Sequence, residues 1–153
     1  MCTVSFVYSN GKIIITSNRD EQVARPASPP KNYLINNKKI IFPKDPKAGG
    51  TWFAVDESAN VSVLLNGAAE KHHWQPPYRR SRGLIVLDIM SETSPLQSWE
   101  CINLDAIEPF TLVLYQEQKL YQLRWNGKQK ETLMLDTAQS YVWSSSTLYS
   151  REI

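Results

Sequence analysis

Residues 2–21 read CTVSFVYSNGKIIITSNRDE, and this stretch decides how the fold begins. The runs on either side of Asn10-Gly11, TVSFVY and KIIITS, are rich in the β-branched and aromatic residues that favour strands. Asn-Gly accepts the positive φ angles of a two-residue hairpin turn. The sequence therefore predicts a buried amino-terminal strand paired with the strand that leads to residues 18–21. Because residues equally far from such a turn are cross-strand neighbours, Cys2 and Asp20 are expected near the same end of this hairpin.

Length, composition and charge limit the kinds of protein that this chain can be. With 153 residues, 42% of them hydrophobic, it is long enough for one domain with a substantial core. A net charge of +2 and a pI near 8.5 are too mild to predict a nucleic-acid partner. The sequence holds no apolar run of about 18 residues, so no insertion into a membrane is predicted.

The cysteines and histidines exclude two further classes of protein. Cys2 and Cys101 are the only cysteines and do not form the disulfide framework of a small secreted domain. No signal peptide is visible, so we expect reduced cysteines and a cytoplasmic localisation. His72 and His73 are adjacent, their side chains point in different directions, and no other ligands stand at a suitable spacing. Neither a metal site nor a cofactor is predicted.

The rest of the chain predicts an α+β domain with mostly antiparallel strands. Ser81 and Ser94 are expected to cap two helices, of which the first ends near residue 91. Residues 25–31 contain three prolines and are expected to form a loop, because proline removes backbone donors and restrains its predecessor. Beyond the hairpin, strands are expected at residues 38–42, 51–55, 60–65, 110–115, 119–125, 128–135 and 141–144.

Cys2 is the first candidate for chemistry. A small residue at position 2 permits removal of Met1, and Cys2 would then carry both a thiol nucleophile and an α-amine base, whose pKa is roughly 7.7–8.0. Arg19 is a candidate cation for the thiolate, and Asp20 for holding the amine. A simpler interpretation stays open, in which Cys2 is a small buried apolar residue beside a polar turn with one surface ion pair.

Two further segments suggest a binding pocket. Gly49-Gly50 permits close approach of the backbone, and Asn66 places an amide donor at a strand end, where an oxyanion would need one. Turn formation beside a core tryptophan, Trp52, explains the same residues. Trp74 lies in the loop at residues 68–82 and is a candidate for lining a pocket that holds an apolar acyl group or a macrocycle.

Three arginines surround the predicted start of the first helix. Arg79, Arg80 and Arg82 stand where the helix dipole disfavours cations, which suggests a site for a carboxylate or phosphate ligand. Such a run is also typical of a solvated face. Both interpretations remain open from the sequence.

Taken in order, these motifs resemble the NRDE family, also called the transport and Golgi organisation 2 family. The resemblance covers essentially the whole chain and implies kinship with the N-terminal nucleophile hydrolases, which form a four-layer αββα sandwich. The residues that carry it are Met1-Cys2, Asn18-Arg19-Asp20-Glu21, Arg25-Pro26, Gly49-Gly50-Thr51-Trp52, Asn66, Ser81-Arg82-Gly83 and Val142-Trp143-Ser144-Ser145.

The resemblance also implies roles for particular residues. Cys2 would be the nucleophile, Arg19 and Asp20 would flank the amino terminus, and Asn66 would lie at the oxyanion hole. The implied reaction is cleavage of a non-peptide C–N amide bond in a small acylated substrate, through a thioester. The candidates for substrate binding are Asn18, Trp52, Trp74 and Arg82.

An alternative function is a non-catalytic binding or trafficking protein of the same fold, which handles a hydrophobic ligand such as haem or lipid. Residues 144–153 look like the cap and first turn of a further helix. We therefore expect residues 1–153 to form a single domain that lacks a C-terminal section of helices and strands, from which the cysteine hydrolases take an asparagine and an arginine. An incomplete sandwich exposes apolar sheet surface, which favours a homo-oligomer.

Overall fold

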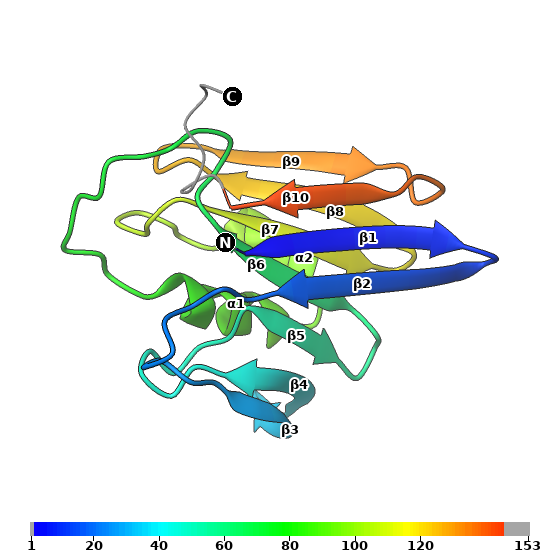
Figure 1. Ribbon diagram of the computed structural model, residues 1–153, viewed down its shortest axis with the longest axis horizontal. Coiled ribbons are helices and arrows are strands. Elements are labelled where there is room, and N and C mark those ends of the chain that lie inside the picture. The colour runs from blue at the N-terminus through cyan, green and yellow to red at the C-terminus, as the bar shows by residue number, and fades with distance from the viewer. Residues whose placement is uncertain (1, 146–153) are drawn as a thin grey trace.

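The computed structural model describes residues 2–145. Within this range the paired strands are antiparallel and form two sheets, one in the order β10-β1-β2 and one in the order β3-β4-β5-β6-β7-β8-β9 (Figure 1). The elements are β1 (Thr3–Ser9), β2 (Lys12–Asn18), β3 (Ser28–Ile35), β4 (Lys38–Lys44), β5 (Phe53–Asp56), β6 (Val61–Asn66), α1 (Arg82–Met90), α2 (Pro95–Cys101), β7 (Phe110–Gln116), β8 (Lys119–Trp125), β9 (Lys130–Leu135) and β10 (Tyr141–Ser144).

The amino-terminal hairpin forms at Asn10-Gly11 as predicted, but it is buried only in part, because β1 buries Val4 and Phe6 and β2 has no fully buried residue. Asn10 and Gly11 have φ angles of 51° and 72°, and β1 pairs with β2 from the turn back to Thr3 and Asn18. The end of β2 therefore delivers the next residues of the chain beside Cys2. β10 pairs with the other edge of β1, so the amino-terminal strand is central in its sheet.

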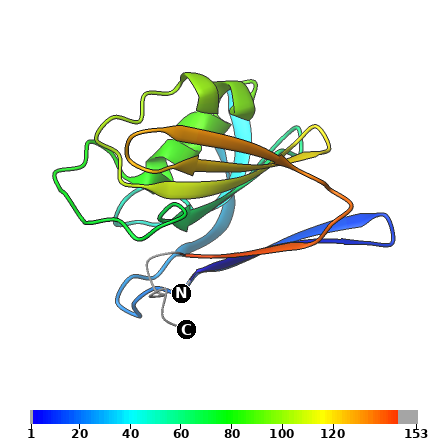
Figure 2. The ribbon, with the colours of Figure 1, turned by 90° about the horizontal axis from the view of Figure 1, so that it is seen from above.

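The elements stack in three layers, as Figure 2 shows: the helices, the seven-stranded sheet and the three-stranded sheet. Strand β6 explains the stacking, because its residues 62–65 are all buried, on both faces of the sheet. Leu64 joins the core under the helices, together with Trp99 and Phe110. Val63 and Leu65 join the core between the sheets, with Phe6 and Trp143 as its large members. The predicted α+β class with antiparallel sheets is confirmed.

Most local predictions also hold. Ser81 and Ser94 cap α1 and α2, each accepting a hydrogen bond from the backbone N–H three residues later. None of the helices within residues 2–145 is long and apolar enough to cross a membrane. The helix start predicted at residues 144–153 falls largely on residues 146–153, outside the described range.

The loop predicted at residues 25–31 is wrong from Ser28 onward. These residues begin β3, which pairs with β4 on one side and forms the edge of the seven-stranded sheet. An edge strand tolerates proline, because the missing N–H groups need not reach a neighbour. The pairing is irregular between Ser28 and Lys31, where Pro29 and Pro30 lie.

Candidate active site

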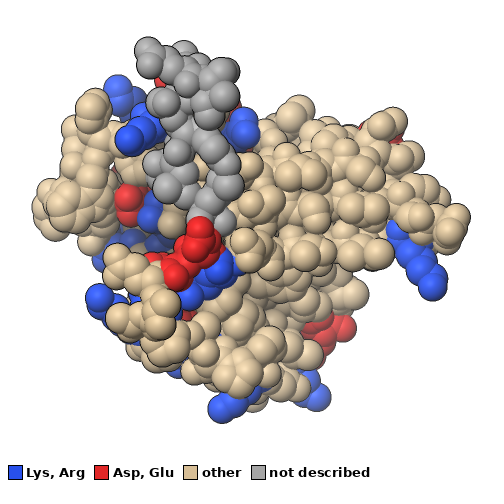
Figure 3. Space-filling view, viewed as in Figure 1, with Lys and Arg blue, Asp and Glu red and all other residues tan. Residues whose placement is uncertain are grey.

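A pocket of about 710 Å³ lies at the end of the sandwich where β1 begins and β2 ends. Its walls come from the loop after β2, the loop before β5, the end of β6 and the start of α1. Acidic and basic side chains gather on the left of the face shown in Figure 3. The pocket is lined by Cys2, Arg19, Asp20, Glu21, Arg25, Asp45, Ala48, Gly50, Thr51, Trp52, Leu64, Asn66, Tyr78, Arg79, Arg80, Ser81, Arg82, Gly83, Leu84 and Glu108.

Cys2 is half-buried at this pocket and also packs against the core between the sheets. Its Sγ lies 3.9 Å from the backbone oxygen of Asp20. Burial raises the pKa of the Cys2 thiol, because the thiolate loses contact with water, while the positive charge of Arg19 acts to lower it. The structure thus brings together the cysteine and the two residues after β2 that the sequence assigned to it.

The Arg19 side chain is 17% exposed and is held from three sides. Its guanidinium lies over the ring of Trp52, 4.6 Å from the centroid, which is a cation–π distance. Its Nη1 donates a hydrogen bond of 3.3 Å to the backbone oxygen of Arg25. The carboxylates of Glu21 and Asp45 lie 3.8 and 3.7 Å from its Nη2. Trp52 therefore supports Arg19 at the pocket.

Asp45 is a member of the site that the sequence analysis missed. Its Oδ2 receives a 2.6 Å ion-pair hydrogen bond from Nη2 of Arg25, and its Oδ1 accepts bonds from the N–H groups of Lys47 and Ala48. Burial acts to raise the pKa of Asp45, but these hydrogen bonds outweigh it, so the pKa is lowered and the carboxyl stays ionised. In the sequence, the only indication that Asp45 accepts hydrogen bonds from its own loop is that it stands just before a turn.

Gly50 and Gly83 explain why two glycine motifs flank the pocket. A Cβ on Gly50 would lie 2.3 Å from the carbonyl carbon of Gly83 and 2.5 Å from the N of Leu84. The N–H of Thr51 donates to the oxygen of Gly83, so the chain before β5 touches the first turn of α1. This contact fixes one pocket wall against another.

Asn66 is the last residue of β6 and lines the pocket, and its backbone oxygen is hydrogen-bonded to Ser145. The hydroxyl of Ser145 donates to the backbone oxygen of Asn66 at 3.0 Å. The N–H of Ser145 donates to the backbone oxygen of Cys2, also at 3.0 Å. Ser145 is only 3% exposed. One buried residue after β10 therefore connects the residue predicted as nucleophile with the residue predicted at the oxyanion hole.

Arg82 lines the pocket wall that the start of α1 forms, and its guanidinium forms an ion pair with Glu108. Its Nη2 lies 3.0 Å from a carboxylate oxygen of Glu108, and its Nη1 donates to the oxygen of Pro109. Burial lowers the pKa of Arg82, and Glu108 acts to raise it. The second carboxylate oxygen of Glu108 is 3.1 Å from Nε2 of His72, which anchors the long loop between β6 and α1.

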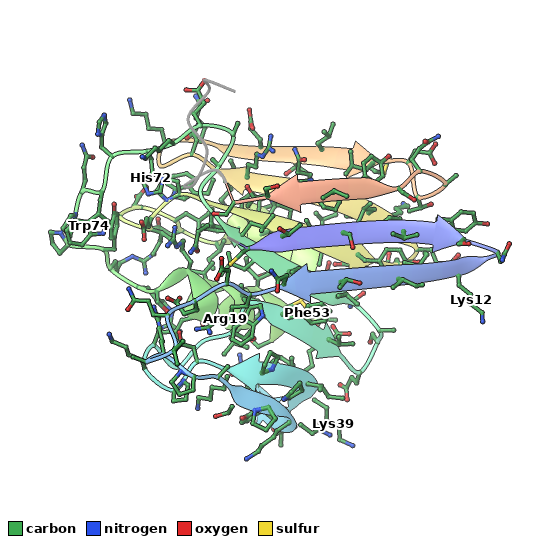
Figure 4. All side chains as sticks on the ribbon, viewed as in Figure 1. Lys12, Arg19, Lys39, Phe53, His72 and Trp74 are labelled. Atoms are coloured by element: carbon green, nitrogen blue, oxygen red, sulfur yellow. The ribbon has the colours of Figure 1, made fainter. Side chains whose placement is uncertain are left out.

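Four other residues named by the sequence lie outside the pocket or are already engaged. Asn18 is exposed and is not a lining residue. Trp74 is 72% exposed at the tip of its loop, away from the strands in Figure 4, and is not a lining residue either. Arg79 donates to two backbone oxygens, and Arg80 forms a two-pronged ion pair with Asp88. Within residues 2–145, no group of three acidic, histidine or cysteine side chains is arranged for a metal.

The fold belongs to the class that the sequence resemblance implied, an α+β sandwich like that of the N-terminal nucleophile hydrolases. The structure is similar to that of a Caenorhabditis elegans N-acylethanolamine-hydrolyzing acid amidase ortholog, with a TM-score of 0.67, over 94% of this chain and 70% of that chain. The two sequences are 9% identical, so the similarity defines the fold. The family model for Transport and Golgi organisation 2 matches residues 1–152, and the chain belongs to that family. A search of curated protein sequences gave no match.

Proposed function

We propose that this chain is a cysteine amidohydrolase of the N-terminal nucleophile type. It would cleave a non-peptide C–N amide bond in a small acylated substrate. The observation that carries this proposal is the presence of Cys2 in one pocket with Arg19, Asp20 and Asn66. The similarity in fold to a protein described as an acid amidase supports it.

The reaction requires a mature chain that begins at Cys2. The α-amine accepts the thiol proton, and the sulfur attacks the carbonyl carbon of the substrate to form a C–S bond. The side-chain amide of Asn66 donates to the oxyanion of the tetrahedral intermediate. The C–N bond then breaks, and the departing amine takes the proton from the α-ammonium group. Water next attacks the thioester and gives a proton to the α-amine, which returns it to the sulfur as the carboxylic acid leaves.

The pocket suits a small substrate that carries polar groups. A volume of about 710 Å³ lies within the usual range for small-molecule sites. Charged side chains make up much of the lining, whereas its apolar members are few, chiefly Trp52, Leu64 and Leu84. A substrate with a short acyl group and hydrogen-bonding functions fits this lining better than a long apolar chain.

Intact-mass spectrometry of the acyl-enzyme tests the proposal. The chain lacking Met1 is mixed with a panel of acyl p-nitroanilides and quenched in acid, and we expect one added acyl group per chain. Cys101→Ser should still form the adduct, whereas Cys2→Ala and the chain that retains Met1 should not, because they lack the thiol or the free α-amine. Amide hydrolysis that survives in Cys2→Ala would refute the mechanism.

The alternative function is a non-catalytic protein that binds or carries a hydrophobic ligand such as haem or lipid, and one observation counts against catalysis. Burial raises the pKa of the Cys2 thiol and so disfavours the reactive thiolate. Haem or a fatty acid should then quench tryptophan fluorescence. Because Trp52 lines the pocket and Trp74 does not, Trp52→Phe should reduce the quenching and Trp74→Phe serves as the matched control. Quenching that depends only on Trp74 would count against binding in this pocket.

A further inference from the structure

The segment at residues 19–25 carries two of the candidate catalytic residues but contains neither a helix nor a strand. A hydrogen bond from the N–H of Arg25 to the oxygen of Gln22 closes a turn inside this segment. That bond shapes the turn without attaching it to the sheets. Contacts that include side chains join this segment to the body of the protein, among them the contact between Cys2 Sγ and the oxygen of Asp20 and the ion pair between Arg25 and Asp45.

Asp45 is a rigid anchor because its own loop holds it in four ways. Its Oδ1 accepts hydrogen bonds from the N–H groups of Lys47 and Ala48, at 3.0 and 3.3 Å. Its backbone oxygen accepts from Gly49 at 2.7 Å, and its N–H donates to Gly50 at 2.9 Å. The Asp45 side chain is 11% exposed. Its position is thus set by the loop that leads to β5.

From this anchor a short chain of contacts leads to Arg19. Oδ2 of Asp45 receives the 2.6 Å bond from Nη2 of Arg25. The backbone oxygen of Arg25 in turn accepts the bond from Nη1 of Arg19, whose guanidinium rests on Trp52. We propose that Asp45 is a positioning residue of the candidate site, which fixes the turn after β2 and thereby holds the Arg19 guanidinium at the Cys2 pocket. This inference rests on the proposed function of Cys2 as a nucleophile.

The charge of Asp45 and its positioning role have opposite effects on Cys2. As a negative charge 3.7 Å from Arg19, Asp45 weakens the positive potential around the thiol. Removing that charge alone would therefore favour the thiolate and speed its reaction with an alkylating agent. Releasing Arg19 from its place would disfavour the thiolate and slow the reaction. Whether the alkylation rate rises or falls when Asp45 is replaced therefore shows which effect dominates, its negative charge or its positioning of Arg19.

The test measures alkylation of the Cys2 thiol by iodoacetamide in the full chain. A Cys101→Ser background leaves Cys2 as the single cysteine, and the rate is followed by intact mass between about pH 6 and pH 10. We expect Asp45→Asn to slow alkylation near neutral pH roughly threefold to tenfold and to move the rate profile to higher pH. Asp136→Asn is the matched control, because Asp136 also accepts a backbone N–H in a turn but does not line the pocket. It should leave the profile unchanged.

A rate in Asp45→Asn that equals or exceeds that of the parent chain would overturn the proposal. If Asp45→Asn shows no cooperative thermal transition, Asp45→Glu decides, because it keeps the charge and displaces the carboxylate. Slower alkylation in Asp45→Glu supports positioning, and an unchanged rate refutes it. No amide substrate is used, so the outcome is separate from the hydrolase proposal. The parent chain could fail to form an acyl-enzyme while Asp45→Asn still slows alkylation. That result would refute the hydrolase proposal and support the positioning role of Asp45.

Discussion

The contact between Gly50 and Gly83 allows a sharp test of how the pocket walls are joined. Replacing Gly50 with alanine would place a Cβ 2.3, 2.5 and 2.7 Å from the carbonyl carbon of Gly83, the N of Leu84 and the oxygen of Gly83. All three are backbone atoms of the first turn of α1, so no side chain can rotate away to make room. The helix start or the loop before β5 must move.

Gly49→Ala is the matched control, because it tests backbone conformation without crowding. Gly49 has a φ of +79°, but the nearest atom to its Cβ is a methyl group of Leu84 at 3.8 Å. Alanine in the left-handed region costs about 1–2 kcal/mol. Overpacking against fixed backbone costs about 1–3 kcal/mol and occasionally more, and the short distances at Gly50 point to the upper end. We expect Gly50→Ala to lose about 3 kcal/mol and Gly49→Ala about 1 kcal/mol.

Urea denaturation followed by tryptophan fluorescence measures both variants. For a chain of this length, about 3 kcal/mol corresponds to a fall in Tm of roughly 6–12 °C. Because Gly83 and Leu84 line the pocket, Gly50→Ala should also slow alkylation of Cys2 or any amide hydrolysis, whereas Gly49→Ala should not. A Gly50→Ala protein no less stable than Gly49→Ala would refute the view that close backbone contact, rather than a special φ angle, requires glycine at position 50.

Two more substitutions test contacts that hold the fold together. Ser145→Ala removes the hydrogen bond to the oxygen of Asn66 but keeps the N–H bond to Cys2, so we expect a loss of about 1 kcal/mol in the free energy of unfolding, with no loss refuting the link. Asp56→Asn removes the negative charge that lies 2.7 Å from the buried ammonium group of Lys38 and should cost about 3 kcal/mol at neutral pH. Burial acts to raise the pKa of Asp56, but bonds from Lys38 and Asn60 lower it, so this stability is present above the unfolded pKa of about 3.9 and disappears as the pH falls further. A difference between the two proteins that stays constant down to about pH 2 would contradict this account.

Features of the fold that depend on residues close together in the sequence could be predicted from the sequence. The Asn10-Gly11 turn needs only two residues with positive φ, and Ser81 caps α1 through a donor three residues away. The strand at Ser28 could not be predicted in this way. Its prolines are the strongest local signal for a loop, and only the order of strands in the sheet shows that they lie on an edge, where proline is tolerated.

The sequence predicted that the candidate site residues on the amino-terminal hairpin lie together. It did not predict the contacts that join distant segments of the chain at the site. The register of β1 and β2 brings Cys2 to the turn that follows Asn18, which a hairpin pattern is enough to predict. Ser145 and Asn66 are 79 residues apart, and their bond depends on two sheets meeting. Trp74 was expected to line a pocket because its loop runs from Asn66 to the first helix, but a position in the sequence does not determine the direction in which a long loop leaves the core.

Burial and the positive charge of Arg19 act in opposite directions on the Cys2 thiolate, and burial has the larger effect. Half-burial withdraws solvent from the thiolate, so a nearby guanidinium has a larger effect than it would on an open surface. Arg19 can have this effect because its two carboxylate neighbours stay at 3.7 and 3.8 Å from Nη2, beyond hydrogen-bond distance. Asp45 gives its short bond to Arg25 instead. The cluster therefore fixes the position of Arg19, while its two carboxylates offset part of the guanidinium charge.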